Sequence, residues 1–387
     1  MDFFRMGTHF FMSLKAKNSL EDDGVAHRLT TLMLAQTKYS SDPRDKIYAI
    51  RSIMPDMFKD IDVDYGKSVQ EVFAEGTRAV IEHTESLEVL FFRSTTELST
   101  TMPSWVVDWS NTDHLIHLMQ QAHIPKKSTT KPVRISFSND SQILNLYGRV
   151  IDTVEHVDWP LSRKFDYKLE RARMGMPKYL SSFEGTFDIV TIRHWIDVAI
   201  GTLQAQFPTD QIITQIAKVL DSDSANNSEL DAWLRMTASD IPLVGWSMET
   251  LDAAWQGKLP PEFEDKLRSI LFPAYKGPLV ELSVDTKILM NVVLDMKGDK
   301  KVITQHFDII RRLGGKKLFI TSEGCIGTSD AHLKKGDRIM VFEGSSFPMI
   351  VRSDGMKNVL IGSANVPSLG IEALLEDERL LQMIQIS

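Results

Sequence analysis

Four short apolar segments decide the fold class of this chain: "KKLFITSEG" (316–324), "DRIMVFEG" (337–344), "PMIVRS" (348–353) and "NVLIGSA" (358–364). Each contains a run of branched, aromatic or Met residues, and turn-forming residues such as Gly324 and Gly344 separate the runs. This composition and punctuation are typical of short β-strands joined by tight turns. The segments therefore predict a β barrel or a β sandwich.

An earlier segment also has apolar runs separated by turn-forming residues. "VRISFSNDSQILNLYGRVIDTVEHV" (133–157) alternates apolar and polar residues on both sides of a turn signal at Asn139 and Asp140. Alternation around such a turn predicts a β-hairpin. We expect the strands within 141–157 to join the same sheet as those within 316–363, although a long stretch of chain separates them.

The segments before and between the strands have helical patterns. In "SSDPRDKIYAI" (40–50), Asp42 is placed as a helix N-cap and Pro43 as the first helical residue. "SVQEVFAEGTRAVIEHT" (68–84) begins with a capping box, in which Ser68 and Glu71 cap each other. Apolar residues also recur at helical spacing within 24–38 and over much of 178–272.

These patterns predict an α+β fold of two regions. An N-terminal helical layer occupies residues 1–125, and residues 126–387 form a β barrel or sandwich that a helical insertion at about 160–275 interrupts. The insertion is expected to cover one mouth of the β region, and its polar run at 221–228 is predicted to be a loop.

Composition excludes several classes of function. The net charge of −8 argues against a general nucleic-acid-binding protein, which needs a basic face. A single cysteine, Cys325, excludes a disulfide scaffold and a thiolate zinc site. No stretch approaches the 18 or so apolar residues of a membrane span, and no secretory signal precedes the helices, so we expect a cytoplasmic protein.

Patterns typical of metal or cofactor sites are weak. The histidines of "HLIHLMQQAH", which are His114, His117 and His123, lack a matching carboxylate and favour a solvated helix face. The acidic run from Asp60 to Glu71 imitates a calcium loop, but its glycine is displaced to Gly66. Because no nucleotide, phosphate or nucleophile motif is present either, we expect no metal and no cofactor.

Three ordered motifs resemble a known family. "SSDPRDKIYAI" (40–50), "IDVDYGKSVQEVF" (61–73) and "MPSWVVDWS" (102–110) are similar to the later blocks of the fungal heterokaryon-incompatibility (HET) domain. That resemblance implies a strand in "VDY" before the helix. "LNLYGRVIDTVEHV" (144–157) and the stretch 317–366, with its Gly336-Asp337 turn and Arg352, look like the family's later β region.

The early blocks of that family have no counterpart here. Members of the family normally begin with a Y-x-A-L-S-Y-x-W-G-like block and an L-W-I-D-x-x-C-I-N-Q-like block. These two blocks belong to the half of the domain that is tied to cell-death signalling. Neither is present, and "ANVPSLGIEAL" (364–374) lacks the aromatic residue of the family's last block. We therefore expect this chain to act without the signalling half.

The expected function is that of a cofactor-independent cyclase of fungal secondary metabolism. Truncated HET-like chains occur among biosynthetic genes. This chain also resembles HET-like proteins that catalyse a norbornene-forming Diels–Alder reaction in diterpene biosynthesis. An intramolecular Diels–Alder reaction on a small apolar terpenoid-like substrate needs only a pocket that holds the reacting groups together. The sequence supplies 18 Met, 19 Phe and 7 Trp for such a pocket, or equally for a large core. The alternatives are a non-catalytic interaction or regulatory protein of heterokaryon incompatibility and an inert remnant of such a protein.

Five residues are candidates for substrate binding: Trp105, Asp108, Trp109, Arg44 and Tyr48. The two indoles, four residues apart, share a face of either a strand or a helix, and with the carboxylate between them they could line an apolar pocket. If the chain is a pocket enzyme, we expect at least one of them to border a cavity together with residues of the helical insertion, rather than both being fully buried. The alternative is a core position for both indoles, with Asp108 binding backbone amides and Asp42 and Arg44 ordering a helix start.

Overall fold

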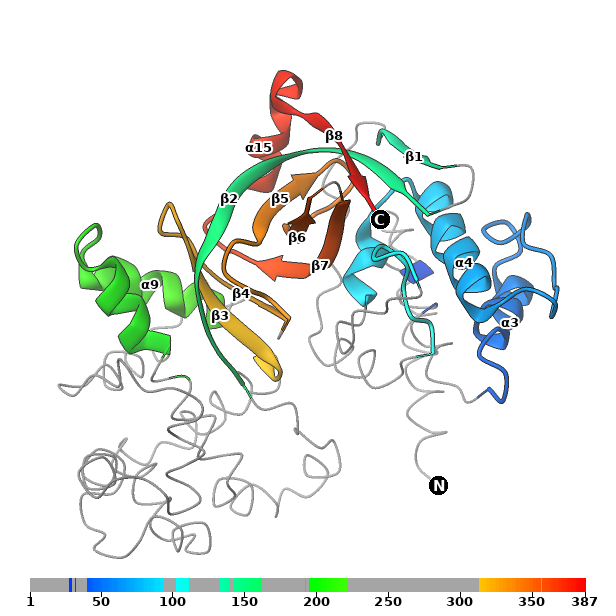
Figure 1. Ribbon diagram of the computed structural model, residues 1–387, viewed down its shortest axis with the longest axis horizontal. Helices are drawn as coiled ribbons and strands as arrows, with labels where there is room; N and C mark the ends of the chain where they lie inside the picture. The colour runs from blue at the N-terminus through cyan, green and yellow to red at the C-terminus, as the bar shows by residue number, and fades with distance from the viewer. Residues whose placement is uncertain are drawn as a thin grey trace, which may run out of the picture.

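The computed structural model describes residues 28, 29, 32, 40–93, 102–110, 133–138, 142–161, 192, 195–220, 313–330, 332–355 and 357–387. Within these residues the fold is α+β, with helices on the N-terminal side and a β barrel on the C-terminal side (Figure 1). None of the described helices has the length and apolar character needed to span a bilayer.

The described strands form a single antiparallel sheet system. They are β1 (Ile135–Phe137), β2 (Leu144–Pro160), β3 (Lys316–Thr321), β4 (Ile326–Asp330), β5 (Arg338–Phe342), β6 (Met349–Asp354), β7 (Lys357–Asn365) and β8 (Gln382–Ile386). The order β2–β3–β4–β7–β6–β5 returns to β2, which closes a six-stranded barrel. The expected pairing of 141–157 with 316–363 is confirmed, and closure decides between barrel and sandwich in favour of the barrel.

Strand β2 holds this arrangement together, and Figure 1 shows it as a long arch over β5, β6 and β7. Its first residues pair with β1 and β8, its middle with β5 and its end with β3. Gly148 pairs with Phe342 of β5 and Gln382 of β8. A Cβ at Gly148 would lie 2.3 Å from the carbonyl oxygen of Val341, so only glycine permits this close approach of strands.

The predicted hairpin and the predicted capping box are confirmed. β1 and β2 pair antiparallel across the predicted turn. Helix α4 (Val69–Thr84) begins with the predicted capping box, since the Ser68 hydroxyl accepts from the Glu71 N–H and the Glu71 carboxylate accepts from the Ser68 N–H. The strand that the resemblance implied at 63–65 is absent, because those residues form an extended segment and a turn that lead into the Ser68 cap.

Helix α3 (Asp45–Ile53) starts slightly later than predicted. Asp42 does cap the helix start, since its Oδ1 accepts the Arg44 N–H at 2.9 Å. The first i to i+4 hydrogen bond, however, runs from the Tyr48 N–H to the Arg44 carbonyl. Residues 42–44 are therefore a tight first turn ahead of the regular helix.

The remaining helices are η1 (Glu88–Phe92), α9 (Thr209–Leu220), α15 (Ile371–Glu376) and η3 (Glu378–Leu380). Residues 195–203 and α9 confirm the helical character of that part of the insertion, and α9 lies beside β4. The rest of the insertion, including the predicted loop at 221–228, lies outside the described residues.

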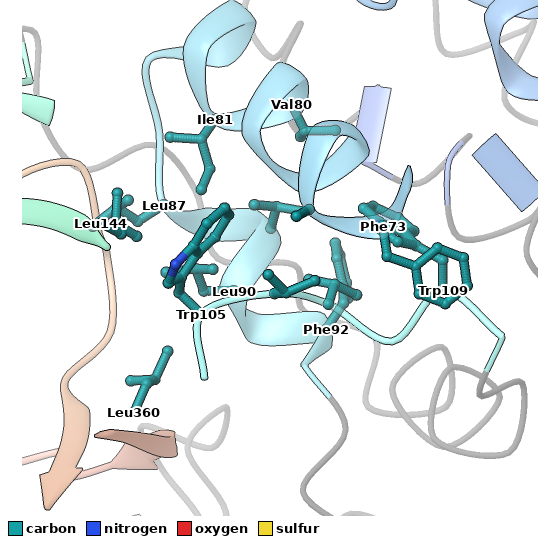
Figure 2. Close-up of a cluster of buried hydrophobic side chains, with 14 of the residues drawn as sticks. Phe73, Val80, Ile81, Leu87, Leu90, Phe92, Trp105, Trp109, Leu144 and Leu360 are labelled. Atoms are coloured by element: carbon teal, nitrogen blue, oxygen red, sulfur yellow. The ribbon is translucent and has the colours of Figure 1, made fainter. Parts of the chain in front are cut away.

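Two of the hydrophobic clusters define how the parts pack. One cluster contains Val154, Phe319, Ile339, Ile350 and Ile361 from β2, β3, β5, β6 and β7, and it fills the barrel. The larger cluster joins the helical layer to the opposite face of the barrel strands (Figure 2). Since residues of α4, η1, β2 and β7 share that cluster, the helical layer and the barrel bury one continuous core.

Candidate functional site

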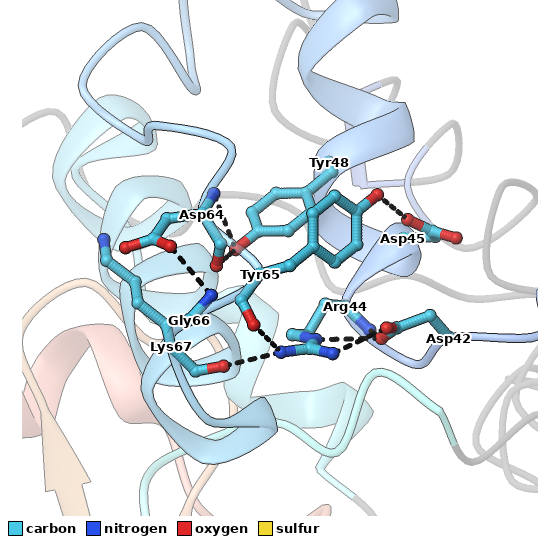
Figure 3. A network of polar contacts seen from close by, with 8 residues as sticks. All are labelled: Asp42, Arg44, Asp45, Tyr48, Asp64, Tyr65, Gly66 and Lys67. Carbon is cyan, nitrogen blue, oxygen red and sulfur yellow. Dashed lines mark hydrogen bonds and ion pairs between the residues drawn. The ribbon is translucent and has the colours of Figure 1, made fainter.

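A polar network surrounds the start of α3, and Arg44 is its centre (Figure 3). The guanidinium group forms a two-pronged pair with Asp42, through Nε to Oδ1 at 3.0 Å and Nη2 to Oδ2 at 2.7 Å. Its Nη1 donates to the carbonyl oxygens of Tyr65 at 2.6 Å and Lys67 at 2.8 Å. Arg44 therefore ties the helix start to the segment that leads into α4.

Tyr48 and Tyr65 extend the network. The Tyr48 hydroxyl donates to the Asp64 carbonyl at 2.7 Å and accepts the Asp64 N–H at 3.3 Å. The Tyr65 hydroxyl donates to Asp45 at 2.6 Å, and its ring meets the Tyr48 ring edge-on with centroids 5.3 Å apart. These polar groups satisfy each other, so the network acts as a brace between α3 and α4.

The pKa values in the network follow from these contacts. The side-chain hydrogen bond from Arg44 holds the pKa of Asp42 below its usual value. The hydrogen bond to Asp45 raises the pKa of Tyr65, because it favours the neutral phenol. Neither shift favours proton transfer by Asp42 or Tyr65 near pH 7. The contacts of Arg44 and Tyr48 go to backbone groups of residues 64–67 and to Asp42.

We expect Arg44→Gln to loosen the segment 60–67. Removing the guanidinium leaves the carbonyls of Tyr65 and Lys67 without their donor, while α3 itself keeps its backbone bonds. Hydrogen exchange should become faster over 60–67 and remain unchanged over β5–β7. Arg51→Gln, on the same helix but outside the network, is the control, and equal exchange in both variants would contradict the brace.

Trp105 and Trp109 both lie in the large core, with 0% and 1% of their surfaces exposed (Figure 2). Trp105 packs against Phe137, with ring centroids 5.2 Å apart, and its Nε1 donates to the Gln142 carbonyl at 3.4 Å. The expectation that the two indoles would not both be fully buried is wrong. Val106 and Val107 between them are buried as well, so the segment is enclosed in the core that joins the helical layer to the barrel.

Asp108 binds a backbone amide, which is the alternative role that the sequence analysis gave it. Its Oδ1 accepts the backbone N–H of Ser110 at 3.0 Å and the Ser110 hydroxyl at 2.6 Å. Such an Asx turn orders the chain where it leaves the core. The carboxylate therefore serves its own segment.

Thr77 and Ser104 are two polar residues of this junction that sequence reasoning missed. The buried Thr77 hydroxyl donates to the Phe73 carbonyl and accepts from the Val107 N–H at 3.2 Å and from Trp109 Nε1 at 3.1 Å. The Ser104 hydroxyl donates to the Ser387 carbonyl oxygen and accepts the Leu360 N–H at 2.8 Å. No signal in the sequence separates these residues from other helix and loop hydroxyls.

Asp337 of the Gly336-Asp337 turn and Arg352, which the resemblance pointed to, form an ion pair in which Asp337 is buried and Arg352 is partly exposed. Arg352 donates through Nε to Asp337 Oδ1 at 2.7 Å and through Nη2 to Oδ2 at 2.8 Å. Gly336 has φ of +89°, which favours glycine because side chains with a Cβ rarely adopt it. The pair fixes the turn before β5 to β6, which is a structural role.

Glu88 is a buried carboxyl group at the junction between η1 and the turn after β5. It is fully buried, and its Oε1 accepts the Ser346 N–H at 2.8 Å. Oε2 has no hydrogen-bond partner among the described residues. Burial raises the pKa of Glu88 to about 8, against a smaller opposite effect of the hydrogen bonds with Ser346. At neutral pH the carboxyl group therefore keeps its proton.

Of the two patterns that resemble metal sites, only the acidic run from Asp60 to Glu71 lies within the described residues. Asp64 and Glu71, from the run that imitates a calcium loop, serve the Gly66 N–H and the Ser68 cap respectively. No group of three or more His, Cys, Asp or Glu side chains in the described part of the chain could hold a metal ion. His114, His117 and His123 lie outside the described residues.

A groove of about 690 Å³ lies between β8 and the barrel, and none of the predicted site residues lines it. Its lining comes from β2, β5, β7, β8 and the end of η3, and includes Arg149, Arg338 and Asn358. Arg338 and Met340 line it, whereas Ile339 between them lies in the interior cluster, so the groove is on the outer face of β5. This groove is a candidate binding surface among the described residues.

One comparison with known proteins finds a family. Residues 282–371 match the Het-6 beta-barrel domain, which links the chain to fungal HET-type proteins. No curated protein and no solved structure matches the chain. The described part of the matched range contains β3 to β7, five of the six barrel strands.

Proposed function

We propose that this chain is a non-catalytic interaction protein of the HET type. One observation supports this proposal above the others: the residues that a pocket enzyme would use instead hold the helical layer on the barrel. Trp105 and Trp109 are sealed in the shared core, and Arg44, Tyr48 and Asp108 satisfy local backbone groups. The helical layer is therefore fixed on the barrel, and the groove between β8 and the barrel lies on the surface of this assembly.

A second candidate is the cofactor-independent cyclase, acting on a terpenoid by an intramolecular Diels–Alder reaction. The groove favours keeping it, because its volume lies within the range of small-molecule sites and its lining mixes apolar side chains with donors. Holding diene and dienophile in contact would supply most of the acceleration. A donor such as Asn358 or Arg338 could polarise an activating carbonyl.

Two assays separate the candidates. The full chain, expressed in a filamentous fungus, should cross-link to a defined partner, and Arg338→Gln should reduce that yield while Arg379→Gln should not. The same chain, purified and kept in EDTA, should leave the cyclisation rate of a diene-bearing terpenoid unchanged. Acceleration with little dependence on pH between about 6 and 8 would favour the cyclase and refute the interaction proposal, since a pericyclic step transfers no obligatory proton.

A further inference from the structure

The groove beside β8 runs along an unpaired strand edge. Among the described strands β8 pairs only with β2, in the register Leu144↔Ile386 to Gly148↔Gln382. On its other edge the Gln385 carbonyl accepts from the Asn358 side chain at 3.0 Å, and the Ser387 N–H donates to the Asn358 carbonyl. That edge of β8 therefore faces the groove at Asn358.

Backbone groups of Met383 point into the same groove. In an antiparallel strand the N–H and C=O groups of alternate residues point to the same edge. Since Gln385 and Ser387 use the edge toward Asn358, the N–H and C=O of Met383, two residues earlier, point to that edge as well. The described residues supply no strand to pair with them.

The charges of the groove are all positive among its described lining residues, which include Arg149 and Arg338 and no carboxylate. Arg338 Nη2 donates to the Asn358 Oδ1 at 2.7 Å, whereas its buried Nε has no partner in the described structure. Arg149 donates to the Leu374 carbonyl at a long 3.5 Å. Arg338 has no carboxylate partner among the described residues, whereas Arg149 lies close enough to the Asp377 carboxylate to help lower its pKa. Arg338 is therefore the cation of the groove that is complementary to an anion.

Apolar side chains lie between and beside these cations. Val150, Leu380 and Met383 line the groove and are 43%, 49% and 56% exposed. The register places Arg149 opposite Val341 and Thr153 opposite Arg338, so the two arginines are three residue pairs apart along the ladder, roughly 10 Å. An occupant must therefore extend along the strand direction and carry both apolar and acidic groups.

We propose that this groove binds an extended acidic–apolar peptide segment of a partner protein, which adds as a strand to the free edge of β8. Main-chain hydrogen bonds to Met383 would hold the peptide backbone, and a carboxylate of the peptide would pair with Arg338. Apolar residues of the peptide would cover Val150 and Leu380. This inference rests on the proposed interaction function and names the chemistry of the partner.

The test uses the full chain and a fluorescein-labelled probe, Gly-Glu-Val-Glu-Val-Glu-Val, followed by fluorescence anisotropy. Alternation places the glutamates on one face of the added strand and the valines on the other. Arg338→Gln should weaken binding by about tenfold or more, since a charge-assisted hydrogen bond is lost. Arg379→Gln makes the same change in net charge at an exposed residue outside the groove, and it should bind as the unmodified chain does.

Two altered probes decide what is recognised. A probe with lysine in place of glutamate should not bind, and a probe whose backbone is N-methylated at alternate residues should bind much more weakly, because it cannot pair with Met383. Equal binding of the N-methylated probe would show a simple anion site and overturn the proposal, as would absence of probe binding or no effect of Arg338→Gln. If the cross-linked partner persists in either case, the peptide inference fails alone; if no partner is found, the interaction function fails.

Discussion

Trp105→Ala should lower the free energy of unfolding by about 3–5 kcal/mol, the range for removal of a buried aromatic side chain. The indole is fully buried between α4, η1 and the first residues of β2, and Figure 2 shows it among Ile81, Leu87, Leu90 and Leu144. Because the cavity would open within the one core shared by the helical layer and the barrel, both parts should lose stability together.

Urea unfolding followed by far-UV circular dichroism and by tryptophan fluorescence measures this effect. Ile53→Ala is the matched control, since Ile53 is an exposed apolar residue of α3 and its truncation should change stability by only about 0.5 kcal/mol. If Trp105→Ala proved equally mild, Trp105 would border a space that tolerates its removal, and the pocket interpretation would return.

Glu88→Gln should make the protein more stable above pH 7 and flatten the dependence of its stability on pH. The pKa of Glu88 is raised from 4.5 to about 8 by burial, so the folded state retains a proton that the unfolded state has lost between these values. The carboxyl group's contribution is therefore fully present below pH 4.5, and stability falls by about 1.4 kcal/mol per pH unit as the pH rises toward 8. Glutamine keeps an oxygen for the Ser346 N–H and cannot ionise.

Chemical unfolding at several pH values between 5 and 9 tests this. The two proteins should have similar stability at pH 5 and differ by a few kcal/mol at pH 8. Glu85→Gln, which changes an exposed carboxylate three residues away, should follow the unmodified chain. Parallel curves for Glu88→Gln and the unmodified chain would contradict a protonated Glu88.

The sequence predicted correctly those elements whose structure depends on residues that are close together along the chain. The capping box at Ser68 and the strands at 316–363 follow from short-range patterns, and both are confirmed. Closure into a barrel rather than a sandwich was left open. It depends on pairings such as Gly148 with Phe342 and Thr328 with Asn365, whose partners no local pattern specifies.

The candidate site was harder to predict for a physical reason. An aromatic pair such as Trp105 and Trp109 has the same pattern whether it lines a pocket or fills a core, because both environments are apolar. Glu88 did leave a signal, a single carboxyl group within the apolar run "SLEVLFF". Arg149, Arg338 and Met383 left none, since the groove exists only after distant strands meet.

The long arch of β2 has a consequence for how the chain is made. Val154 pairs with Thr321, and the helical layer needs Leu144 and Leu360 to complete its core. Contacts at such separations carry a high loop-closure entropy and slow the search for the native state. During synthesis the helical layer therefore emerges well before the strands that cover it, with its apolar face exposed for that interval. This protein should depend on chaperones that hold nascent chains more than a protein of equal size built from local contacts.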